Sequence, residues 1–115
     1  MKRSQQLYFG DIIEAISKIL TYTTGKGFKS FSSDGMTIDA VVRNFEILGE
    51  AAKHISPALK DKYPDIPWQE MTAMRNKVIH EYFGVDVEII WETVNNILPE
   101  LLKVLKKTCK QEFGG

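Results

Sequence analysis

The sequence predicts an all-α protein: an antiparallel bundle of four main helices with a minor fifth. Apolar residues recur at intervals of three and four along four long segments, the period of a helix with one buried side. No segment alternates apolar and polar residues between hairpin turns, and no internal repeat is visible. A chain of 115 residues suits one domain with a buried core, so we expect a single domain over residues 1–115.

The first helix is expected to begin after Ser4, a residue type that caps helices, and to end near Thr24, before Gly25 and Gly27. Its buried stripe is predicted as Tyr8, Ile12, Ala15 or Ile16, Ile19 and Thr23. Residues 28–35 carry glycine and serine, which predicts a mobile connection with two phenylalanines folded back onto the bundle.

The second helix is expected from about Met36 to Ser56. Its buried side is predicted as Ile38, Val41 or Val42, Phe45, Leu48, Ala52 and Ile55. A short amphipathic helix is expected over residues 57–63, followed by an extended corner forced by the two prolines of residues 64–67.

The third long helix is expected over Trp68–Phe83, with Trp68 anchored in the core and Gly84 in a left-handed conformation just beyond the helix end. The last helix is expected over residues 87–113, capped by Asp86. Because Pro99 lies inside it, we predict a kink near Asn95 and Asn96 that divides it into two segments.

Composition excludes several classes of protein. The 15 basic residues equal the 15 acidic ones, so broad electrostatic capture of nucleic acid is not expected and any RNA site must be local. No apolar run is long enough for a membrane span, and no apolar segment of a secretory signal follows the first residues, which predicts a cytoplasmic protein. Cys109 is the only cysteine, and we interpret it as an incidental thiol.

The third long helix carries three residues that suit phosphoryl chemistry without a metal or other cofactor. Arg75 offers a fixed positive fork for phosphate, His80 has a proton that moves near neutral pH, and Tyr82 supplies a hydroxyl. Composition alone gives these residues little weight, because a helix often holds an arginine and a histidine that only pack or face solvent.

Helix geometry does not bring the three residues together. At about 100° per residue, Tyr82 lies within roughly 20° of Arg75, whereas His80 lies about 140° away. Three arrangements would unite them: the last turn near Gly84 distorts, Arg75 reaches round the helix, or the same helix of a second subunit completes the site across a two-fold axis.

The second helix has a polar side made of Arg43, Glu46, Glu50 and Lys53. This side is either a solvated face with ion pairs along the helix, or one wall of a cleft in which Arg43, Glu46 and Glu50 support the site. Gly49 lies beside the apolar stripe and permits close approach of another backbone, at a helix contact or a subunit contact. His54 shows no partner pattern and is expected to be an ordinary surface or boundary histidine.

Arg75-x4-His80-x-Tyr82, with Asn76 directly after the arginine, resembles the signature of the HEPN superfamily and specifically its HepT-like branch. The segments 43–52, 66–68 and 82–86 also resemble that family, in the same order. The resemblance extends from about Tyr8 to Leu102.

The resemblance implies a homodimer whose cleft holds two arginines and two histidines, with Arg75 and His80 as the catalytic residues and Asn76 and Tyr82 in support. It implies metal-independent cleavage of RNA by the toxin of a toxin–antitoxin pair. In such toxins, the tyrosine at the place of Tyr82 accepts AMP from a partner nucleotidyltransferase antitoxin of the MntA type. Tyr82 is therefore either a modification site or a residue that holds a nucleotide in the site.

Two other functions compete with a ribonuclease. The chain is alternatively a non-catalytic subunit that binds nucleotide or substrate for a nucleotidyltransferase, with Arg75 and His80 only gripping phosphate. It is also compatible with a purely structural dimerisation module, in which replacing Arg75 or His80 changes no activity. Helical bundles host many functions, so the fold class does not decide among the three.

Overall fold

The computed structural model describes the backbone of residues 4–84 and 86–114, and the side chains of all of these except residues 78–84. Within these ranges every regular element is a helix, which confirms the predicted all-α fold. The helices are α1 (Gln5–Thr23), α2 (Phe28–Ser32), α3 (Gly35–Lys53), α4 (Pro57–Lys62), α5 (Trp68–Gly84), α6 (Val87–Asn96) and α7 (Leu98–Phe113).

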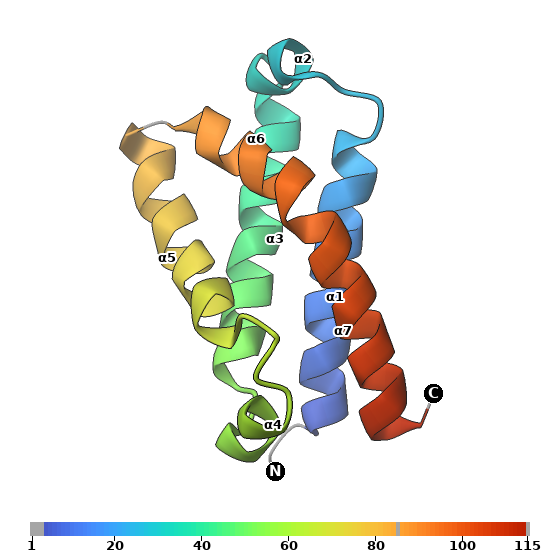
Figure 1. The fold of residues 1–115 in the computed structure, drawn as a ribbon. Coiled ribbons are helices and arrows are strands. Elements are labelled where there is room, and N and C mark those ends of the chain that lie inside the picture. Colours follow the sequence, from blue (N-terminus) through green and yellow to red (C-terminus); the bar gives the residue numbers. More distant parts are fainter. Residues whose placement is uncertain (1–3, 85, 115) are drawn as a thin grey trace.

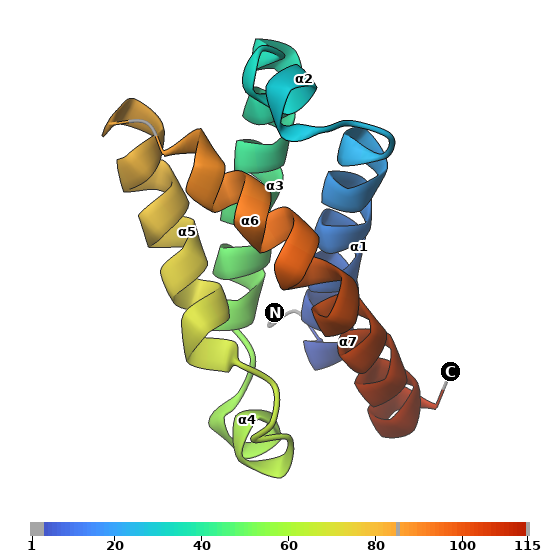
Figure 2. The same ribbon diagram turned by 45° about the horizontal axis from the view of Figure 1, so that its top comes forward.

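Figure 1 shows α1 and α3 side by side and antiparallel, with α5 packed against α3 and α7 packed against α1. The short helices α2 and α4 lie at opposite ends of the bundle and connect its long helices. Figure 2 shows α6 passing obliquely across one face, from the end of α5 to the start of α7. As a result α5 lies at the edge of the bundle, with α3 as its main neighbour.

Polar side chains at the helix starts explain why the helices begin where they do. Each of four residues accepts a hydrogen bond from the backbone N–H three positions later and so satisfies a donor that the helix itself leaves unpaired. These caps are Ser4 on Leu7 (3.2 Å), Asp34 on Thr37 (3.1 Å), Ser56 on Leu59 (3.2 Å) and Asp86 on Ile89 (3.3 Å).

The core lies among α1, α3 and α7 and is closed at one end by the start of α5. Its fully buried large residues include Phe9, Ile12, Ile16, Ile19, Phe45, Leu48, Met71, Leu98 and Leu105. Trp68 is anchored as predicted: its ring packs edge-to-face on Phe9 at 5.6 Å, and its Nε1 donates to the Tyr63 carbonyl at 3.0 Å. Tyr8 is only half-buried, so the buried aromatic of α1 is Phe9.

Residues 28–35 were predicted as a connection, but they contain α2. The polar composition of the segment supports this single turn, because Ser30 Oγ accepts from Gly27 N–H at 3.1 Å. Phe31 is fully buried, and the centroid of its ring lies 4.9 Å from that of Trp91. The prediction that a phenylalanine of this segment packs onto the bundle is thus confirmed for Phe31. Phe28 remains 37% exposed, so only one of the two phenylalanines enters the core.

The helix ends differ from the predictions in instructive ways. The chain does break within 87–113 as predicted, at Ile97 between α6 and α7, with Pro99 in the first turn of α7 where no N–H is needed. Helix α3 ends at Lys53, because Ser56 caps α4 instead of continuing α3. Helix α5 includes Gly84, so the prediction that Gly84 lies beyond the helix is wrong by one residue.

No helix in the described part of the chain is long and apolar enough to cross a membrane.

Candidate functional site

Helices α3 and α5 touch at Gly49 and Arg75. A Cβ atom placed on Gly49 would lie 3.4 Å from the Cα atom of Arg75 and would overlap with its Cβ atom. Only glycine therefore permits this spacing of the two helices. The predicted close approach at Gly49 is a contact between helices, and its partner is the arginine of the candidate site.

The guanidinium of Arg75 has two polar neighbours. Its Nε lies 3.8 Å from Glu50 Oε2, and its Nη1 donates to Asn76 Oδ1 at 3.1 Å. The side chain is 40% exposed. Because a guanidinium has five N–H groups, these contacts orient it while leaving donors for an anionic ligand.

Arg75 lines a groove of about 550 Å³ on the surface formed by α1, α3 and α5. The groove is lined by Tyr8, Asp11, Arg43, Glu46, Ile47, Glu50, Ala51, His54 and Arg75. The structure therefore brings together four of the sequence-predicted site residues. Within this set Arg43 Nη1 lies 3.3 Å from Glu46 Oε2, an exposed pair of the kind that contributes little to stability.

His54 is the residue that sequence reasoning missed. Its ring stacks on Tyr8, with centroids 5.0 Å apart and planes 14° from parallel, and its Nε2 lies 3.4 Å from Glu50 Oε1. Glu50 therefore lies between His54 and Arg75. The four-residue spacing of Glu50 and His54 is a signal for the first contact, but the stacking on Tyr8 joins two helices and has no local signature.

Asn76 lines a different hollow, between α3, α4 and α5. It is exposed, and its hydrogen bond from Arg75 is the polar link between the two recesses. The structure thus places Asn76 beside the arginine but outside the groove.

The side chains of His80 and Tyr82 lie outside the residues that the structure describes. The α5 backbone, however, continues as one α-helix through both positions. Positions 75 and 80 are therefore about 140° apart around the axis, and the backbone does not support a distorted last turn. A long reach of Arg75 and completion by a second subunit remain as ways to unite the residues.

Among the described residues, no group of three or more His, Cys, Asp and Glu side chains is arranged to hold a metal ion. The groove lining instead sets two arginines against three carboxylates, Asp11, Glu46 and Glu50. Such a surface suits a ligand with both an anionic group and hydrogen-bond donors, as a nucleotide has.

The family model described as Ribonuclease HepT-like matches residues 12–108. The chain belongs to the HepT-like family. This confirms the resemblance seen in the motif. The match includes all of α3 and α5, and thus the contact between Gly49 and Arg75.

Several relatives are similar to this chain over nearly their whole length. A protein of Thermococcus cleftensis named as a probable ribonuclease HepT is 46% identical over 110 residues, covering 96% of this chain and all of the relative. A candidate RNase of Methanocaldococcus jannaschii is 37% identical over 98% of this chain and 93% of its own length. A candidate RNase of Caldanaerobacter subterraneus is 38% identical over 91% of this chain and 94% of its own length. No solved structure matches the chain at a significant level.

Proposed function

We propose that this protein is an endoribonuclease that cleaves RNA without a metal ion and acts as the toxin of a toxin–antitoxin pair. The observation that carries the proposal is the position of Arg75, held at the groove by its contact with Gly49 and its neighbours Glu50 and Asn76. Membership of a family whose relatives are named as ribonucleases supports RNA as the substrate.

In the proposed reaction, the ribose 2′-hydroxyl attacks the adjacent phosphorus and the bond to the 5′ oxygen breaks. His80 takes the proton of the hydroxyl, and a second His80 or a water molecule returns a proton to the leaving oxygen. Arg75 neutralises the charge that gathers on the phosphoryl oxygens, and Asn76 keeps the guanidinium in place. The products are a 2′,3′-cyclic phosphate and a 5′-hydroxyl, and DNA is inert because it has no 2′-hydroxyl.

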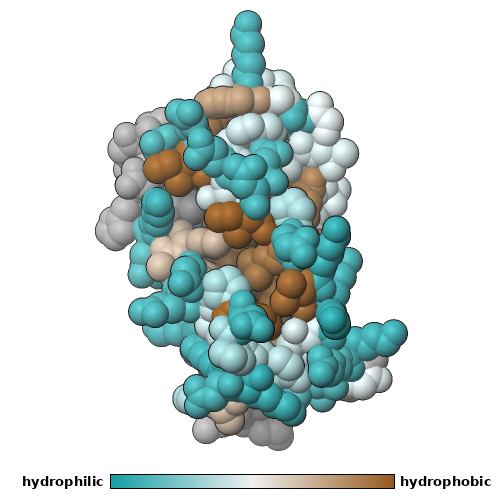
Figure 3. Space-filling model, viewed as in Figure 1, coloured by the Kyte–Doolittle hydropathy of each residue, from teal (hydrophilic) through white to brown (hydrophobic). Residues whose placement is uncertain are grey.

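The proposed active form is a homodimer that joins α5 and part of the Arg43–Lys53 stretch of α3 to their copies. Two-fold symmetry would bring position 80 of one subunit near Arg75 of the other, which one straight α5 does not achieve. The edge position of α5 leaves room for a second copy (Figures 1 and 2). Figure 3 shows apolar side chains at the surface between α5 and α7, beside the edge helix α5.

Regulation is proposed to act at Tyr82. Position 82 is roughly 20° from Arg75 around α5, two turns further along the helix. AMP transferred to the Tyr82 hydroxyl by a partner nucleotidyltransferase would add bulk and negative charge within reach of the guanidinium. The adenylate would then occupy the place of an RNA phosphate and keep the toxin inactive in the cytoplasm.

The proposal is tested with purified protein, free of modification, acting on an RNA and on DNA of the same sequence in the presence of EDTA. We expect cleavage of the RNA alone, and rates at least about 100-fold lower for Arg75→Ala and His80→Ala, because each removes a charge or proton carrier used in the transition state. Lys106→Ala, an exposed residue of α7, is the control and should cleave normally.

Normal cleavage by either of the two site variants would overturn the assignment of catalytic residues. A wild-type protein that binds nucleotide but never cuts RNA would instead favour the non-catalytic subunit of a nucleotidyltransferase.

A further inference from the structure

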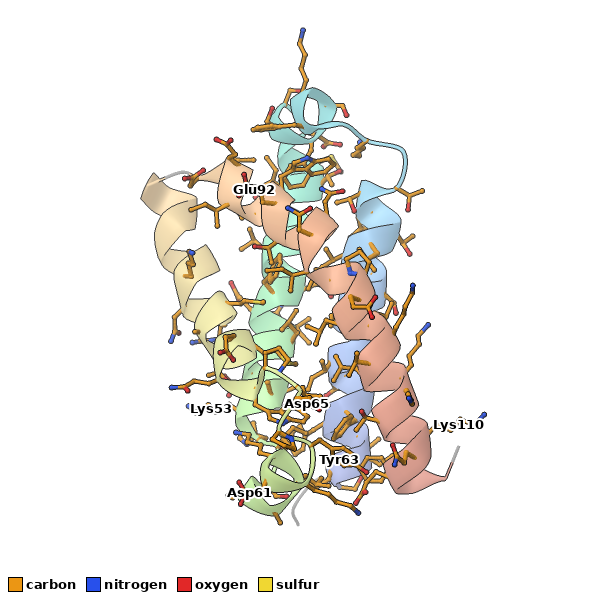
Figure 4. The ribbon with its side chains drawn as sticks, in the orientation of Figure 1. Lys53, Asp61, Tyr63, Asp65, Glu92 and Lys110 are labelled. Atoms are coloured by element: carbon orange, nitrogen blue, oxygen red, sulfur yellow. The ribbon has the colours of Figure 1, made fainter. Side chains whose placement is uncertain are left out.

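A second recess, which we call the lysine hollow, lies where the ends of α3 and α4 meet the first turns of α5. It has a volume of about 440 Å³. Lys53 is the last residue of α3, and Lys60 lies in the last turn of α4. The polar lining is Lys53, Lys60, Gln69, Thr72 and Asn76. Figure 4 shows Lys53 near the start of α5, on the side of the molecule away from α7.

The lysine hollow has a net positive charge. No aspartate or glutamate is among the described residues that line it, and neither lysine forms an ion pair within the described part of the chain. Three lysines elsewhere in the described part of the chain are paired with carboxylates: Lys18 with Glu14, Lys26 with Asp34 and Lys62 with Glu112. Two unneutralised cations at the walls of one recess create a local positive potential, although the chain as a whole is neutral.

The side of α5 that faces the lysine hollow reinforces this preference for anions. Gln69, Thr72 and Asn76 follow one another at three- and four-residue spacing and so share one face of the helix. The amide NH2 groups of Gln69 and Asn76 are hydrogen-bond donors. The hollow also lies at the first turns of α5, where the helix dipole is positive.

Asn76 connects the lysine hollow to the candidate site, because its Oδ1 accepts from Arg75 Nη1 at 3.1 Å while its side chain lines the hollow. An anion in the hollow and a phosphate on Arg75 would therefore be neighbours along one strand. A polymer with regularly spaced phosphates satisfies both positions at once, which a single small anion does not.

We propose that the lysine hollow binds a backbone phosphate of single-stranded RNA next to the phosphate that Arg75 engages. The proposal rests on the proposed ribonuclease function and extends it from the cleaved bond to the path of the strand. Lys53 and Lys60 hold the substrate but take no part in proton transfer, so they should affect binding and leave the chemical step unchanged.

The test compares two double variants that remove the same charge. Lys53→Gln/Lys60→Gln empties the lysine hollow of cations, whereas Lys106→Gln/Lys110→Gln does the same on the exposed face of α7. Figure 4 shows Lys110 projecting from α7 on the side opposite Lys53. The probe is a fluorescent 2′-O-methyl oligonucleotide, which cannot be cleaved, titrated over a salt series. Thermal unfolding followed by circular dichroism checks that both variants fold.

Each lysine–phosphate contact contributes about 0.7 to the slope of log Kd against log salt for a single strand. The hollow variant should therefore lower the slope by about 1.4. The ratio of its Kd to that of the wild type should then be about 25-fold larger in 0.1 M salt than in 1 M salt. The α7 variant should keep the wild-type slope. With cleavable RNA, the hollow variant should raise KM and leave kcat unchanged.

Equal slope changes in both double variants, or none in the hollow variant, would overturn the proposal. AMP is the second probe: if wild type binds AMP as tightly as the oligonucleotide and the hollow variant loses both equally, the hollow holds free nucleotide and no RNA strand. The result is separable from the proposed function. If the protein never cuts RNA but shows the expected slope change, the phosphate site in the lysine hollow stands and the ribonuclease function is contradicted. If it cuts RNA but shows no slope change, the ribonuclease function stands and the phosphate site is contradicted.

Discussion

Gly49 of α3 and Arg75 of α5 are packed so closely that any side chain at position 49 would overlap with Arg75 Cβ. Gly49 therefore sets the distance between α3 and α5, and with it the position of Arg75 at the groove. Glu50, the next residue along α3, lies 3.8 Å from the Nε of that arginine. Two consecutive residues of α3 thus contact Arg75, one at its backbone and Cβ atom and the other at its charged end.

Gly49→Ala is expected to destabilise the protein, although alanine is the better helix former by about 1 kcal/mol. The added methyl group must push α5 away from α3, and such overpacking typically costs about 1–3 kcal/mol. Urea unfolding measures the change, and the same shift of Arg75 should slow RNA cleavage.

Gly10→Ala is the matched control, because Gly10 lies within α1 and a Cβ atom there would meet nothing within 4 Å. It should stabilise the protein by about 0.5–1 kcal/mol through the lower entropy of the unfolded chain. A Gly49→Ala variant as stable as Gly10→Ala would show that α3 and α5 separate without cost.

Local signals explain which parts of the fold the sequence could predict. Pro99 lacks an N–H and so predicts the break between α6 and α7. Ser4 has a side chain that caps helices and so predicts the start of α1. The turn of α2 has no such signal, because its serines and glycine are also typical of a loop. Its helical form depends on Phe31, which is buried against Trp91 from a distant part of the chain.

The candidate site likewise has residues that local spacing predicts and contacts that depend on distant parts of the chain. The spacing of Arg43, Glu46 and Glu50 places them on one side of α3, and the structure finds all three on the groove. The stacking of His54 on Tyr8 joins residues 46 positions apart in the chain, so no periodicity within α3 reveals this contact. The relation of Arg75 to position 80 concerns two subunits in our proposal, which no single helix encodes.

Acid should weaken the cap of α3. The Thr37 hydroxyl and backbone N–H donate to the Asp34 carboxylate at 2.6 and 3.1 Å, and with Lys26 they lower its pKa from 3.8 to about 2. A depressed pKa means that the carboxylate stabilises the folded state above pH 3.8, and that this contribution is lost as the pH falls towards 2.

Urea unfolding of wild type and Asp34→Asn at pH 7, 4 and 2 measures this loss. The variant should be less stable than wild type at pH 7, and the difference should shrink as the pH falls to 2. A difference that stays constant over this range would show that ionisation of Asp34 does not stabilise the fold.

Tyr82→Phe is expected to leave most RNA cleavage intact and to make the protein resistant to its partner nucleotidyltransferase. The ring is kept and only the acceptor oxygen is removed. Incubation with the partner and ATP should add AMP mass to the wild type and none to the variant. Modification of the variant would place the acceptor elsewhere, and a toxic but still neutralised variant would assign inhibition to complex formation alone.

Mixing two inactive variants tests whether the site is shared between subunits. In a dimer of Arg75→Ala with His80→Ala, one intact Arg75 faces one intact His80 of the other chain. Random subunit exchange makes half of the dimers mixed. If each dimer has two independent sites in which water returns the proton, each mixed dimer has one good site, so about a quarter of the wild-type activity should return. Recovery must be absent if both residues act within one chain.

Light scattering should show dimers throughout, and monomers at micromolar concentration would contradict the shared site.

The most direct test of the central claim is cleavage of an RNA that carries a single 2′-deoxyribose immediately before the mapped cut, with EDTA present. Metal-independent attack by the 2′-hydroxyl predicts that cutting at this bond stops while other susceptible bonds are still cut. It also predicts that unmodified RNA yields 2′,3′-cyclic phosphate and 5′-hydroxyl ends. Unchanged cutting at the deoxyribose, or loss of all cutting in EDTA, would contradict the account.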